Sequence, residues 1–113
     1  MSGQVLCRAD EVGEEEARGY VLDDHSLVLV RRDGQLHLYV NWCPHLGIEL
    51  NFQPDEFLDY DRRFLQCANH GALFEIDNGL CILGPCKGQS LRKVDFEVVA
   101  GEVVVTRLPE RRQ

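Results

Sequence analysis

The sequence lacks an apolar run long enough to cross a membrane. Its longest such run, residues 27–30, is closed by Arg31 and Arg32, whereas a transmembrane helix needs roughly 20 apolar residues. Residues 1–4 show no basic stretch leading into an apolar one, so no export signal is expected. We therefore expect a cytoplasmic protein without a membrane partner.

Positive charge is scarce in this chain. Lysine and arginine number 12 against 19 acidic residues, which gives a formal net charge of -7. Proteins that bind nucleic acid recruit basic side chains, so a nucleic-acid partner is not expected. An acidic surface suits fast, weak docking onto a basic patch of another protein. The alternative interpretation is that the charge only keeps the protein soluble.

Cysteine is present in an odd number, five, which does not favour a framework of disulfides. Two of the five fall in the motifs described below, which leaves Cys7, Cys81 and Cys86. Cys81 and Cys86 could pair if the loop between them folds back. A reducing cytosol favours free thiols instead.

Long helical patterns are also missing, and short β-strands separated by turn residues account for most of the chain. Asp33-Gly34 between two β-rich runs is a strong hairpin signal. Only residues 14–18 or 55–58 could form a helical turn, and neither segment is long enough to predict a helix. With 113 residues we expect one all-β domain, 1–113. The expected strands are 4–7, 19–22, 27–31, 36–40, 64–67, 72–76, 80–83, 96–99 and 103–106.

Residues 35–41 alternate apolar and polar side chains, as in a strand with one buried face. Leu36, Leu38 and Val40 are expected to face the core. The residues expected on the other face are Gln35, His37, Tyr39 and Asn41. His37 is therefore predicted to be a surface residue and not a metal ligand.

Two short motifs carry the chemistry. They are Cys43-Pro44-His45-Leu46-Gly47 and Cys67-Ala68-Asn69-His70-Gly71, and each offers one thiolate and one imidazole. Two Cys and two His fit a [2Fe-2S] cluster in which histidines replace cysteines on one iron. They also fit tetrahedral zinc. Zinc motifs usually group Cys with Cys and His with His, so the mixed pairs favour iron and sulfide; visible and EPR spectra distinguish the two.

Both motifs begin where an expected strand ends, which places the candidate ligands in paired loops. Gly47 and Gly71 allow backbone conformations and close approaches that other residues resist. Leu46 is a candidate for excluding water from the site. Trp42, beside Cys43, is expected to be a packed aromatic at a strand end.

On these motifs the chain resembles the Rieske family, and in particular the small Rieske-type ferredoxins. The resemblance spans residues 27–105 and includes Ala72-Leu73-Phe74 and Gly84-Pro85-Cys86 followed by Leu91. It implies an antiparallel β-sandwich with a small cluster-binding loop subdomain at about 42–88. It also implies that Gly84-Pro85 belongs to a loop covering the third side of the cluster.

By this resemblance Cys43 and Cys67 bind one iron of a [2Fe-2S] cluster, and His45 and His70 bind the outer iron. The role of Cys86, which stands where relatives carry a small apolar residue, is left open. The residues expected to surround the ligands are Leu46, Gly47, Gly71, Ala72, Pro85 and Cys86.

The function implied by the resemblance is one-electron transfer from a flavin reductase to an oxygenase or another terminal oxidoreductase. No catalytic residue is expected, because only His25 and His37 remain for a second, mononuclear iron site. The alternative is an accessory or redox-sensing subunit of a larger oxidoreductase. Fast, salt-sensitive oxidation by an acceptor would support a carrier, and tight, salt-resistant association would support a subunit.

Three residues differ from one branch of the family, and two of them predict a low reduction potential. Ile48 stands where the respiratory and photosynthetic branch of the family has a disulfide cysteine, and Ala72 and Phe74 stand where that branch has Ser and Tyr. Without those hydroxyl donors the midpoint is expected near the low end of the Rieske range, about -150 mV. Protein-film voltammetry measures it.

Overall fold

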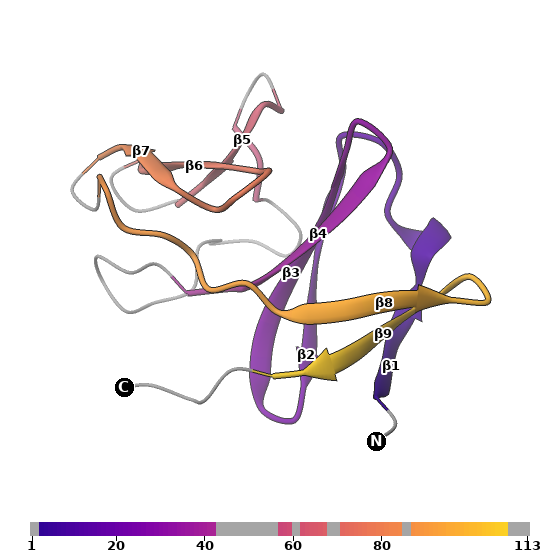
Figure 1. Cartoon of the computed structure of the whole chain (residues 1–113). Helices are drawn as coiled ribbons and strands as arrows, with labels where there is room; N and C mark the ends of the chain where they lie inside the picture. The colour runs from indigo at the N-terminus through magenta and orange to yellow at the C-terminus, as the bar shows by residue number, and fades with distance from the viewer. Residues whose placement is uncertain (1–2, 43–56, 60–61, 68–70, 85–86, 109–113) are drawn as a thin grey trace.

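A computed structural model describes residues 3–42, 57–59, 62–67, 71–84 and 87–108 (Figure 1). In these ranges the regular structure is β apart from one short 3₁₀ turn, η1, so the predicted all-β class is confirmed. The elements are β1 (Gln4–Arg8), η1 (Ala9–Glu11), β2 (Ala17–Leu22), β3 (His25–Arg32), β4 (Gln35–Val40), β5 (Phe64–Gln66), β6 (Leu73–Glu75), β7 (Cys81–Leu83), β8 (Asp95–Val99) and β9 (Glu102–Arg107).

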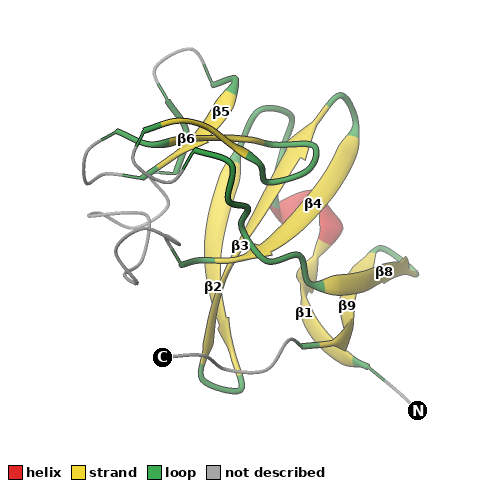
Figure 2. Ribbon diagram, turned by 60° about the vertical axis from the view of Figure 1, so that its left-hand side comes forward, coloured by secondary structure: helices red, strands yellow, loops and turns green. Residues whose placement is uncertain are grey.

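Within the described ranges the strands form three antiparallel sheets of three strands each. The central sheet has the order β2-β3-β4, the terminal sheet β1-β9-β8 and the small sheet β5-β6-β7. The small and terminal sheets lie on opposite sides of the central sheet (Figures 1 and 2). The segment that leads into β8 also pairs with β4, through the bridge between Lys93 and Tyr39.

The central sheet is buried on both faces. Val28 and Val30 of β3 belong to a core cluster shared with the small sheet, whereas Leu27 and Leu29 belong to a second cluster shared with the terminal sheet. All four side chains are fully inaccessible to solvent. The unbroken apolar run of β3 therefore follows from its position between two layers, since a strand covered on both sides needs no polar face.

The hairpin predicted at Asp33-Gly34 is confirmed. β3 pairs with β4 up to Arg32 and Gln35, and the two turn residues have φ angles of 53° and 76°. Positive φ at both positions is the geometry that Asp-Gly favours. The Glu14 carboxylate accepts hydrogen bonds from both turn amides, at 2.6 and 2.9 Å, and fixes the turn to the segment before β2.

The prediction of a solvent-facing side for β4 is wrong. Tyr39 is fully buried and Asn41 is 3% exposed. The alternation itself is correct, because Tyr39 and Leu38 lie in different core clusters. The small sheet covers the face of β4 that was expected to meet solvent. The Tyr39 hydroxyl is satisfied in this buried position because it donates a hydrogen bond to the carbonyl oxygen of Ile76.

The remaining strand predictions are confirmed to within a few residues, but the helical turn is misplaced. Ala17 and Arg18, expected to end a turn, begin β2, and the 3₁₀ turn lies at Ala9–Glu11. In the second candidate segment Leu58 bridges to Leu65 in β fashion, whereas residues 55 and 56 lie outside the described ranges. None of the described residues forms a helix that could cross a membrane.

Candidate metal centre

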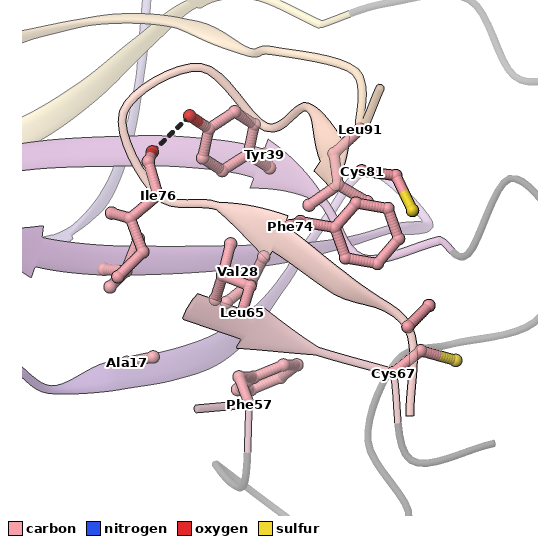
Figure 3. Packing of buried hydrophobic residues seen from close by; sticks show 12 residues of the cluster. Ala17, Val28, Tyr39, Phe57, Leu65, Cys67, Phe74, Ile76, Cys81 and Leu91 are labelled. Atoms are coloured by element: carbon pink, nitrogen blue, oxygen red, sulfur yellow. Dashed lines mark hydrogen bonds between the residues drawn. The ribbon is translucent and has the colours of Figure 1, made fainter. Parts of the chain in front are cut away.

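Cys67 is an expected ligand whose position the structure describes. It follows β5 directly and is fully buried. β5 is fixed because Leu65 and Gln66 pair with Phe74 and Leu73 of β6. The thiol therefore lies at the end of a well-anchored strand, within the core cluster between the small and central sheets (Figure 3).

The two ends of the segment that carries the second motif are joined. The backbone amide of Cys67 donates a hydrogen bond to the carbonyl oxygen of Ala72 over 2.9 Å. Gly71, just before Ala72, has a φ of 66°, which confirms the left-handed backbone expected there. Ala72 is itself 1% exposed. The segment thus returns to the small sheet close to the point where it leaves.

The end of β7 approaches the same place. A Cβ atom built on Gly84 would lie only 2.9 Å from the Cα atom and 3.0 Å from the Cβ atom of Ala72. Beyond Gly84 the chain turns back, since the amide of Lys87 donates to the carbonyl of Gly84 at 3.2 Å and the amide of Gly88 to that of Cys81 at 3.1 Å. Cys67, Ala72 and Gly84 therefore form one connected group.

The end of β4 is held by backbone bonds, but its aromatic residue is not packed. The amide of Asn41 donates to the carbonyl of Ser26 at 2.8 Å, and the Asn41 side chain lies 3.2 Å from the Ser26 hydroxyl. Trp42 is 43% exposed. The expectation of a packed Trp42 is therefore wrong, because neither core cluster includes it.

The other expected site residues lie outside the described ranges. Within the part of the chain that is described, no three His, Cys, Asp or Glu side chains converge as a metal site would require. The expected residues with no described position are Cys43, His45, Leu46, Gly47, His70, Pro85 and Cys86.

Two other cysteines are buried, Cys7 and Cys81. Cys81 belongs to the same core cluster as Cys67, and its thiol donates to the carbonyl of Leu83 at 3.3 Å. The possible partner Cys86 lies outside the described residues. Cys7 packs beside Tyr20, and burial raises the pKa of its thiol. No sequence pattern predicts that Cys81 lies in the same cluster as Cys67, because that depends on the register of β7.

The two described histidines, His25 and His37, each have a polar neighbour. The Nδ1 atom of His25 lies 2.9 Å from the carbonyl oxygen of Asp23 at the β2–β3 turn. His37 has a side chain only 17% exposed, 3.9 Å from the Asp77 carboxylate, so its predicted surface position is wrong. Burial lowers the pKa of His37, and nearby Lys93 lowers it further, against the opposing effect of Asp77. This histidine sits where the small and central sheets meet.

Comparison with known proteins gives one family. The model of the Rieske [2Fe-2S] domain family matches residues 2–107. No curated protein sequence matches the chain.

Solved structures of low sequence identity share the fold. The ferredoxin of carbazole 1,9a-dioxygenase from Nocardioides aromaticivorans IC177 is 18% identical, with a TM-score of 0.74 over 93% of this chain and 97% of that one. A Sphingomonas yanoikuyae B1 ferredoxin is 20% identical, with a TM-score of 0.74 over 94% and 99%. The terminal oxygenase of carbazole 1,9a-dioxygenase from the same organism is 20% identical, with a TM-score of 0.78. That match covers 97% of this chain but only 31% of the oxygenase chain.

Proposed function

The chain belongs to the Rieske [2Fe-2S] domain family, and we propose that it is a one-electron carrier, not itself an enzyme. The observation that carries the proposal is the family match over residues 2–107 together with a fold shared with ferredoxins over almost their whole length. The proposed ligands are Cys43, His45, Cys67 and His70.

The described residues fit a [2Fe-2S] cluster. Cys67 provides a buried sulfur directly after β5, so the paired strand holds the backbone that carries this sulfur in place. Two ferric ions, two sulfides and two thiolates are together neutral when the imidazoles are neutral, so the oxidised group suits an apolar surrounding such as that of Cys67. Such a cluster accepts and releases one electron. The chain's own part is to bind it, to exclude water and to leave an exit for the electron.

The partners follow from the relatives. Solved structures include a reduced complex between oxygenase and ferredoxin of carbazole 1,9a-dioxygenase, and this chain covers 29% of the matched chain there. We infer an oxygenase as electron acceptor and a flavin reductase as donor, each docking transiently. The net charge of -7 supports attraction to a basic patch. The odd number of cysteines, five, supports a reducing compartment such as the cytoplasm.

A set of cysteine variants tests the cluster assignment. Cys67→Ala is expected to abolish the iron and sulfide content and the EPR signal of the reduced protein, because one of two proposed thiolate ligands is removed. Iron, acid-labile sulfide and EPR are measured on protein purified without air. His70→Ala tests the nitrogen side in the same way.

Cys7→Ala and Cys81→Ala are the matched controls, since both residues are buried cysteines outside the proposed ligand set. Both variants should retain the cluster. A wild-type protein without iron and sulfide, or a Cys67→Ala variant with an unchanged EPR spectrum, contradicts the proposal.

A further inference from the structure

We propose that the contact between Gly84 and Ala72 is a steric lock that holds the segment after β7 against the segment that carries Cys67, which makes Gly84 a positioning residue for the cluster. The inference rests on the proposed function, since it assumes a cluster bound through Cys67. The two residues of the lock are Gly84, just after β7, and Ala72, just before β6.

The first observation is the closeness of the two backbones. A Cβ atom on Gly84 would lie 2.9 Å from the Ala72 Cα atom, 3.0 Å from its Cβ atom and 3.6 Å from its amide nitrogen. Distances under about 3.0 Å between such carbon atoms are repulsive, because carbon contacts are optimal at about 3.5–4.0 Å. The atoms in the way include backbone, so a side chain at position 84 would push the two segments apart.

The second observation is that Ala72 cannot give way without moving Cys67. The carbonyl of Ala72 accepts the hydrogen bond from the amide of Cys67 at 2.9 Å, and both residues are buried in the same core cluster. Leu73, the next residue, is paired on both sides, with Gln66 of β5 and Leu83 of β7. A displacement of Ala72 is therefore transmitted to the residue that supplies the thiolate.

Gly84 also has a φ of 109°, so a side chain there strains the backbone as well as meeting Ala72. Gly88 allows these two effects to be separated. It lies in the same turn with a φ of 93°, but a Cβ atom at Gly88 would meet no atom within 4 Å. Ala at position 88 therefore has the backbone strain without the clash.

The experiment compares Gly84→Ala with Gly88→Ala in the holoprotein purified without air. The rate of cluster loss to an iron chelator is followed by visible absorbance, and the g values of the reduced cluster are recorded by EPR. Gly84→Ala is expected to lose its cluster about tenfold faster than wild type, with shifted g values, because a clash of this kind destabilises the bound geometry. Gly88→Ala is expected to stay within about a factor of two of wild type, with unchanged g values.

Equal effects of the two variants would overturn the lock, because strain alone would then explain them. A Gly84→Ala protein with wild-type cluster loss and g values would overturn it too. If Gly84→Ala does not fold, as judged by circular dichroism, Gly88→Ala decides, because it has a similar positive φ without a neighbouring atom within 4 Å. A Gly88→Ala protein that folds and keeps its cluster supports the contact, and a Gly88→Ala protein that also fails to fold contradicts it. Absence of a cluster from wild type would instead reject the proposed function, so the two failures are distinguishable.

Discussion

Tyr39 joins two sheets through both parts of its side chain. Its ring is fully buried in the cluster between the central and small sheets, and a Cβ atom on Gly79 would lie 2.9 Å from the ring. Its hydroxyl donates to the carbonyl of Ile76 at the start of the β6–β7 turn (Figure 3). A larger residue at position 79 would displace the ring, so the glycine and the tyrosine depend on each other.

Removing that hydroxyl should cost stability. Tyr39→Phe keeps the ring but leaves a buried carbonyl without its donor, and the expected loss is about 1–3 kcal/mol in the free energy of unfolding. Urea denaturation followed by fluorescence measures it. The control is Tyr20→Phe, whose hydroxyl donates at 3.1 Å to Glu11 at an exposed site and should cost less. A Tyr39→Phe variant as stable as wild type would show that the bond contributes nothing.

Among the elements, β6 links the core to the candidate site. Phe74 is fully buried and pairs with Leu65 of β5 and Cys81 of β7. Ala72, just before β6, accepts the hydrogen bond of the Cys67 amide. Neither side chain has a hydroxyl group, which is the basis of the low reduction potential that the sequence predicts.

A hydroxyl introduced on β6 should raise that potential. In Phe74→Tyr the added donor can stabilise the reduced, more negative cluster, and a hydrogen bond worth about 0.5–1.5 kcal/mol corresponds to about 20–65 mV. Protein-film voltammetry measures the midpoint. Phe96→Tyr, on β8 in the other core cluster, is the control and should leave the midpoint unchanged. A Phe74→Tyr midpoint equal to or below that of wild type contradicts the expectation.

On the scale of the whole molecule, each core cluster is associated with a phenol of raised pKa. Burial raises the pKa of Tyr39, and the charge of Asp77 adds to the effect. Burial likewise raises the pKa of Tyr20, which packs against the other cluster, with further contributions from Cys7 and Glu11. The folded protein therefore holds these protons more tightly than the unfolded chain does.

This difference predicts a loss of stability in base. Below pH of about 10, the phenol pKa in an unfolded chain, both states keep the protons and the contribution is fully present. As the pH rises above that value the unfolded chain releases them first, so the free energy of unfolding falls. Urea denaturation between pH 8 and 11 measures the slope. The variant Tyr20→Phe/Tyr39→Phe should show a shallower slope, and an identical slope would exclude the two phenols as its cause.

Position within the fold explains which sequence predictions failed. The Asp33-Gly34 hairpin was predictable because its two positive φ angles depend on the residues of the turn itself. The surface position of His37 was not, because the small sheet that covers it is formed by residues far along the chain. The prediction for Trp42 was wrong in the opposite direction, because the residue was expected to be packed and is exposed. An aromatic residue at a strand end is buried only if another element packs against it.

The sequence by itself determined the strands, the tight turns and the four candidate ligands, because backbone preferences and ligand chemistry belong to individual residues and their neighbours. Only the tertiary structure decided that the central sheet is covered on both faces and that Gly84 touches Ala72. Burial and contact of this kind depend on which distant segments pack together. No local pattern contains that information.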